Sequence, residues 1–203
     1  MFLTYLSDML AEGLTPLTLS VLSLVLFRLW VGVQKKLYRG RLPLLILMVL
    51  YLNAMYTVTG LPTLQHLTFE ANINLIPFSD FRDGRFYYLS FLNILMTVPL
   101  GMLLPLCWDG FHSWKNALMA GVLTALTIEI LQLFCYRATD IDDVIFNTLG
   151  TMLGYLLMKC LFGRNWQKPP KVSCTGYYAL NAVIIACTFF LREPLGELFY
   201  QIF

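Results

Sequence analysis

Charged residues are scarce in this sequence. Asp, Glu, Lys and Arg make up 13% of the 203 residues, and apolar residues make up 58%, whereas a soluble domain carries about 25% charged and about 45 to 50% apolar residues. A chain so short of charge cannot cover its surface in water. The bilayer is then its solvent, and backbone polar groups within the bilayer must be paired internally, as they are in a helix. The composition predicts an all-α, polytopic integral membrane helical bundle.

The signatures of several functional classes are also missing. The net charge is only +2, and no basic run alternates with aromatic residues as a nucleic-acid groove requires, which argues against nucleic acid as a partner. The five cysteines show neither CxxC nor Cys/His spacing, so neither a disulfide framework nor a zinc site is predicted. No GxSxG, HExxH or P-loop motif occurs. Because these motifs are absent, the sequence predicts no cofactor.

Long apolar runs are what the chain does contain. A membrane span needs about 20 apolar residues, and six stretches qualify: 14–34, 42–61, 91–108, 115–135, 143–162 and 176–191. The sequence shows no internal repeat among these stretches. We therefore expect about six transmembrane helices in a single membrane domain over residues 1–203.

Basic residues are distributed unevenly between the two sides of the predicted bundle. Cytoplasmic loops collect Lys and Arg. One side carries Lys35, Lys36, Arg39, Arg41, Lys115, Lys159, Arg164, Lys168 and Lys171, and the other carries Arg82, Arg85, Arg137 and Arg192. The first side is then cytoplasmic, which places segment 62–90 and the turn at 136–142 outside the cytoplasm.

Ionisable residues cluster around the fourth and fifth predicted spans. A charge at the centre of a membrane helix costs about 2.5 to 3.5 kcal/mol on insertion scales and usually marks function. Glu129 lies two helical turns before Arg137, and Gln132 lies on the same helical face as Glu129. We expect the two to form a polar patch directed at the bundle interior.

Three carboxylates follow within four residues: Asp140, Asp142 and Asp143. With Glu129, they are the candidates for general acid or base, and the three aspartates could bind a divalent cation. The alternative is structural, because Asp140 or Thr139 followed three positions later by an acid forms a capping-box pattern at a helix start. Asn147 extends the polar stripe by one turn. Gly150 and Gly154 have a GxxxG spacing, which favours close helix packing.

A second group of polar residues lies on the same predicted side. Arg85 and Arg137 present planar forks suited to phosphate or carboxylate. Asn74 and Asn93 are candidates for orienting a bound group. We expect Asn74, Arg85, Asn93, Gln132, Arg137 and Asn147 to form the binding residues of one extracytoplasmic polar cleft.

The ordered motifs of this region resemble the VanZ-like family of bacterial membrane proteins. They are NLIPF at 74–78, Arg85, NILMTVPLG at 93–101, the Glu129 and Gln132 pair, Arg137, and DIDDVIFNTLGTMLGY at 140–155. The resemblance covers about residues 70–160. It implies a multi-pass protein of the bacterial inner membrane, in a family whose founding member is associated with resistance to the glycopeptide teicoplanin.

Three functions stay open at this point. The resemblance implies a membrane protein that lowers susceptibility to teicoplanin or other lipoglycopeptides by acting on a lipid-linked or lipid-anchored envelope molecule. The carboxylates and arginines could instead serve an intramembrane hydrolase or transferase. Glu129 within the bilayer is the argument for a small transporter, and the lack of an inverted repeat argues against one.

Overall fold

The structure is a computed structural model of the whole chain. It describes residues 2–30, 41–69, 72–79, 84–135, 137–163 and 173–202, and it describes side chains in these ranges from residue 13 onward except those of 30, 84 and 85.

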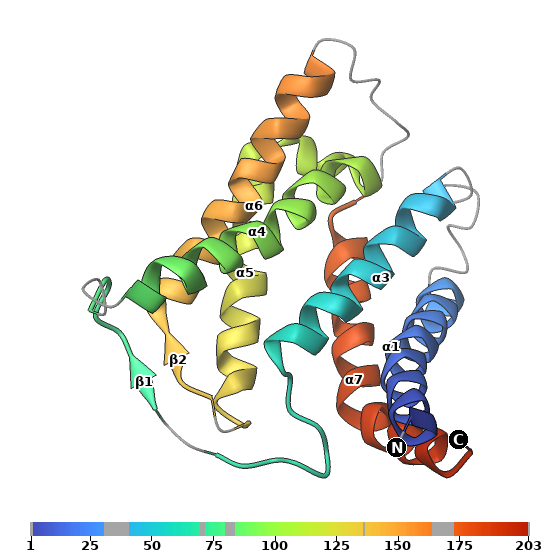
Figure 1. Ribbon diagram of the computed structural model, residues 1–203. Coiled ribbons are helices and arrows are strands. Elements are labelled where there is room, and N and C mark those ends of the chain that lie inside the picture. Colours follow the sequence, from blue (N-terminus) through green and yellow to red (C-terminus); the bar gives the residue numbers. More distant parts are fainter. Residues whose placement is uncertain are drawn as a thin grey trace. The chain divides into compact units, whose positions relative to one another are not determined.

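Six α-helices account for most of the described residues (Figure 1). They are α1 (Phe2–Trp30), α3 (Leu42–Thr59), α4 (Gly84–Cys107), α5 (Trp114–Gln132), α6 (Ile141–Phe162) and α7 (Thr175–Ile202). A short 3-10 helix, η3 (Asp109–His112), precedes α5, and the strands β1 (Ile73–Asn74) and β2 (Thr139–Asp140) are two residues each. Each predicted span corresponds to one helix, with residues 31–34 of the first span lying outside the described residues, so the all-α prediction is confirmed.

Four stretches in the described part of the chain are long and apolar enough to cross a membrane: Leu42–Thr59, Phe86–Cys107, Trp114–Gln132 and Ile141–Phe162. A shorter apolar stretch, Gly13–Leu29, lies within α1. The protein is therefore a multi-pass membrane protein.

The chain forms two compact units. Unit 1 contains Met1–Leu67 and Tyr178–Phe203, and thus α1, α3 and most of α7. Unit 2 is Thr68–Tyr177, which contains both strands, η3 and the helices α4, α5 and α6.

Glycines bring the helices of unit 2 into close contact. A Cβ atom at Gly101 would overlap the carbonyl oxygen of Thr151, and one at Gly154 would overlap that of Val98. At Gly150 it would overlap the backbone of Ile94. Only glycine lets the backbones of α4 and α6 approach this closely. The predicted packing role of Gly150 and Gly154 is confirmed.

Buried aromatic side chains close the end of unit 2 opposite the strands. The rings of Trp108, Phe111 and Tyr177 contact one another edge to face, with centroids 5.5 to 6.3 Å apart. The Tyr177 hydroxyl lies 2.6 Å from that of Thr124 on α5. This cluster anchors the first turn of α7 to unit 2.

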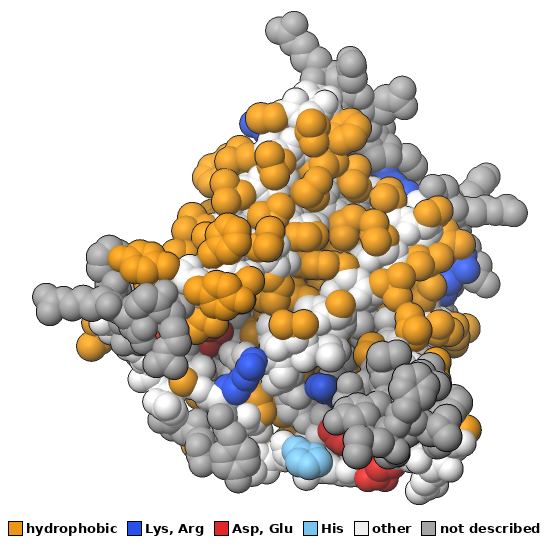
Figure 2. All heavy atoms as spheres, viewed as in Figure 1, with side chains coloured by type: hydrophobic (Ala, Val, Ile, Leu, Met, Phe, Trp, Pro, Cys, Tyr) orange, Lys and Arg blue, Asp and Glu red, His pale blue; other side chains and the backbone are white. Residues whose placement is uncertain are grey.

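The exposed side chains of α4 and α6 are largely apolar. Figure 2 shows hydrophobic side chains covering the visible faces of α4 and α6. The exposed ones on these helices include Phe91, Leu95, Leu149, Leu153 and Leu157. Contiguous exposed apolar surface of this kind suits contact with lipid.

Candidate functional site

The polar cluster of unit 2 comprises Asn74, Asn93, Glu129, Gln132, Arg137, Asp140, Asp142, Asp143 and Asn147. A parallel strand pair assembles it, with Ile73 opposite Thr139 and Asn74 opposite Asp140. The backbone N–H of Thr139 donates to the carbonyl of Asn72 at 2.9 Å. Figure 1 shows the two strands side by side near the beginnings of α4 and α6. The NLIPF segment is thereby held against the start of α6.

Asp140 caps helix α6. Its backbone is extended, and its Oδ1 accepts from the backbone N–H of Asp142 at 2.9 Å, as the capping pattern predicts. Its Oδ2 accepts from the side-chain amide of Asn74 at 3.1 Å. The same amide donates to the Ser79 hydroxyl at 2.7 Å. Asn74 thus contacts both the Asp140 carboxylate and the loop that contains Ser79.

Glu129 supplies the second half of this cap from another helix. In a capping box, the acid three positions after the cap accepts the cap's own N–H. Here the N–H of Asp140 donates instead to Oε2 of Glu129 at 3.0 Å, and the Thr139 hydroxyl donates to the Glu129 carbonyl at 3.0 Å. The Glu129 side chain is 3% exposed. The buried carboxylate therefore fixes the turn between α5 and α6.

Asp143 is engaged by α4. Oδ1 of Asp143 accepts from the side-chain amide of Asn93 at 2.5 Å. Glu129 cannot reach out to water, and it interacts electrostatically with Asp143 and Asp140. Asn93 and Asp143 are both part-exposed. A cation or a hydrogen-bond donor would stabilise two carboxylates that repel each other in this way.

Asp142 holds the loop that follows β1. Both of its carboxylate oxygens accept from the backbone N–H of Phe78, at 3.0 and 2.9 Å, and the residue is 4% exposed. Phe78 has φ 59°, the left-handed region that a bulky residue rarely adopts. The sequence gives no sign of this contact, because its donor is a backbone group.

Arg137 is the basic residue of the polar cluster. It is exposed and interacts electrostatically with both Glu129 and Asp143. Cys135 is two residues away. Burial raises the pKa of its thiol above the ordinary value, and the smaller opposing effect of Arg137 does not cancel this rise. The thiol is therefore neutral at pH 7. The side chain of Arg85 lies outside the described residues, so its predicted place beside the aspartates stays a prediction.

Two amides extend the polar cluster into the helix packing. Gln132 is 6% exposed and Asn147 is 3% exposed. Within the described part of the chain, Oδ1 of Asn147 has no hydrogen-bond partner. Asn147 follows Asp143 by one helical turn on α6. A buried acceptor of this kind calls for a donor from water or a bound molecule.

A cation site is not evident from the geometry. Among the described residues, no group of three or more His, Cys, Asp or Glu side chains is placed to hold a metal ion. Asp140, Asp142 and Asp143 each turn toward a different partner: the cap, the Phe78 loop and Asn93. The divalent cation at these three aspartates stays a prediction.

Comparisons with known proteins identify the family of this chain. The family model described as VanZ/LLP1 matches residues 42–163. Protein VanZ of Enterococcus faecium is 35% identical over 92 residues, which cover 43% of this chain and 53% of that protein, so the match spans about half of the relative's length. No solved structure matches the chain. Because the family model covers more than half of the residues, this chain belongs to the VanZ/LLP1 family.

Proposed function

We propose that the protein lowers bacterial susceptibility to teicoplanin or other lipoglycopeptides, and that its polar cluster does so by binding a lipid-linked or lipid-anchored envelope molecule. The protein is an inner-membrane protein in this account, and the polar cluster faces away from the cytoplasm. Membership of the VanZ/LLP1 family supports the phenotype. The orientation rests on the distribution of Lys and Arg along the sequence.

The observation that carries the proposal is the buried acceptor of Asn147, one helical turn after Asp143 on α6. A structural role accounts for Asp140 and Asp142, because both are engaged by backbone N–H groups. It leaves the Asn147 oxygen without a donor in the described part of the chain. Hydroxyl, amide or ammonium groups of a sugar-peptide headgroup would satisfy it.

Arg137 is exposed in the polar cluster and could bind an anionic group of the ligand, whereas Asn147 would accept from a hydrogen-bond donor. Its guanidinium suits a phosphate or carboxylate of the same ligand. Arg85 is the second candidate for this contact. A ligand with both an anionic group and hydrogen-bond donors would therefore contact Arg137 and Asn147 together, as the headgroup of a lipid-linked cell-wall intermediate could.

Susceptibility measurements test the proposal. A sensitive bacterium expresses the wild type, Arg137→Ala, Asn147→Leu or an empty vector, with membrane abundance compared by blot. We expect the wild type to raise the inhibitory concentration of teicoplanin more than that of vancomycin. Both substitutions should remove that protection at equal abundance. Full protection by both variants would contradict the assignment of the polar cluster.

An intramembrane hydrolase or transferase is the second candidate function, and the electrostatic interaction between the Glu129 and Asp143 carboxylates favours it. Two carboxylates in one electrostatic environment can divide the roles of acid and base. Purified protein would then release a product from a radiolabelled lipid-linked cell-wall precursor. Asp143→Asn would abolish that release, and a chelator would abolish it if the aspartates hold a divalent cation.

A further inference from the structure

A cavity of about 450 Å³ lies within unit 1 and shares no residue with the polar cluster. Its size falls in the range of small-molecule sites, about 300 to 1,000 Å³. Residues of α1, α3 and α7 line it: Thr15, Pro16, Leu19, Thr57, Arg192, Glu193, Gly196 and Tyr200.

The cavity lies at one end of a membrane span. Thr57 is in the last turn of α3, which ends at Thr59 and is apolar enough to cross a membrane. Gly60 follows with φ 69° and ends the helix. The cavity is therefore at the level where lipid headgroups meet water.

Two opposite charges and a small apolar wall line the cavity. Arg192 and Glu193 are adjacent on α7, and Leu19 on α1 is 3% exposed. Among the described residues, no carboxylate forms an ion pair with Arg192. The planar guanidinium of Arg192 suits an anion, and phosphate fits its geometry.

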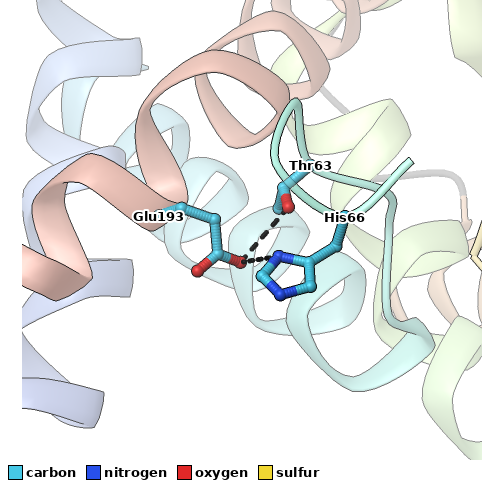
Figure 3. A network of polar contacts seen from close by, with 3 residues as sticks. All are labelled: Thr63, His66 and Glu193. Atoms are coloured by element: carbon cyan, nitrogen blue, oxygen red, sulfur yellow. Dashed lines mark hydrogen bonds and ion pairs between the residues drawn. The ribbon is translucent and has the colours of Figure 1, made fainter.

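The Glu193 carboxylate is held in position by the loop after α3. Figure 3 shows Thr63 and His66 converging on it. The Thr63 hydroxyl donates to Oε1 at 3.2 Å, and Nδ1 of His66 lies 3.8 Å from the same oxygen. Both contacts use Oε1, so Oε2 can accept from a ligand. A positioned carboxylate beside an arginine suits a zwitterion.

We propose that this cavity binds a zwitterion of the phosphoethanolamine type, with its phosphate on Arg192 and its primary ammonium on Glu193. The source is either the headgroup of an ethanolamine phospholipid or a soluble phosphoethanolamine compound. A primary ammonium donates up to three hydrogen bonds, and a trimethylammonium group donates none. The site therefore distinguishes ethanolamine from choline headgroups.

Calorimetric titration of the purified full-length protein in detergent tests the proposal. The probes are short-chain phosphatidylethanolamine, phosphatidylcholine and phosphatidylglycerol, and free phosphoethanolamine. The variants are Arg192→Gln, Glu193→Gln and Gly196→Leu. Gln at 193 still accepts from Thr63, so it removes only the charge.

A Cβ at Gly196 meets nothing within 4 Å, so leucine there can fill the cavity without a backbone clash. Glu197→Gln is the matched control, because Glu197 is exposed on the same helix and does not line the cavity.

The expected result is a preference for the ethanolamine lipid over the choline and glycerol lipids of about tenfold, the usual value of one charge-assisted hydrogen bond. Glu193→Gln should remove that preference, Gly196→Leu should abolish binding, and Glu197→Gln should bind as the wild type does. Comparison of the lipid with free phosphoethanolamine identifies the source, and tighter binding of either supports the site. Equal binding of all three lipids, or an unchanged preference in Glu193→Gln, would overturn the proposal.

Discussion

The backbone N–H of Phe78 lies 3.0 and 2.9 Å from the two carboxylate oxygens of Asp142. One residue is in the loop after β1, and the other is in the first turn of α6. The contact fixes a bulky residue in the left-handed region of φ, a conformation that costs of order 1 to 3 kcal/mol. The surrounding structure must offset this cost, and Asp142 is the side chain that contacts the strained peptide.

Asp142→Ala is expected to release this loop. It leaves the Phe78 N–H without its acceptor, and such a loss costs about 1 to 3 kcal/mol. Chymotrypsin should then cleave the purified protein after Phe78 faster than it cleaves the wild type. Glu197→Ala, at an exposed position on α7, should leave the cleavage rate unchanged. An unchanged rate in Asp142→Ala would show that the loop is held by other contacts.

Gly154→Ala should destabilise unit 2. The added Cβ would overlap the carbonyl oxygen of Val98 on α4, and overpacking of this kind costs about 1 to 3 kcal/mol. The matched control is Gly196→Ala, whose Cβ meets nothing within 4 Å. That control should gain up to about 1 kcal/mol from helix propensity alone. Thermal unfolding followed by tryptophan fluorescence measures both, and a higher melting temperature for Gly154→Ala would contradict the packing account.

The membrane orientation can be tested by cysteine labelling. Ser79 and Ser173 are exposed and are separated along the chain by α4, α5 and α6, so they lie on opposite sides of the membrane. In a chain with its native cysteines replaced, an impermeant maleimide should label Ser79→Cys in intact cells. It should label Ser173→Cys only after the membrane is opened. The reverse pattern would place the polar cluster in the cytoplasm.

Apolar run length predicts most of the fold, because a span in lipid must be both apolar and helical. The six predicted stretches each fall on one helix. The helix ends differ by several residues where polar residues continue a helix, as Asp142 does at the start of α6. The small β1–β2 pair was not predicted, since two-residue strands leave no periodic pattern.

The candidate site was predictable only in part. The N-cap role of Asp140 follows from a local pattern and is confirmed. The capping box is not formed, because the Asp140 N–H donates to Glu129 and Asp143 accepts from Asn93. The reach of Glu129 to the Asp140 N–H depends on how α5 and α6 meet. The contact between Glu193 and Thr63 joins residues 130 positions apart. Such contacts depend on tertiary packing, which a single sequence does not encode in any local signal.

If the polar cluster acts on an envelope molecule, loss of the Glu129 charge should remove protection, and Glu129→Gln tests this. Glutamine keeps an oxygen that can accept from the Asp140 N–H, so the turn should survive while the charge is lost. The measurement is the teicoplanin inhibitory concentration of cells carrying this variant, at membrane abundance and melting temperature equal to those of the wild type. The account predicts loss of protection in that folded variant. Full protection would show that Glu129 only holds the helices together, and that the polar cluster is structural.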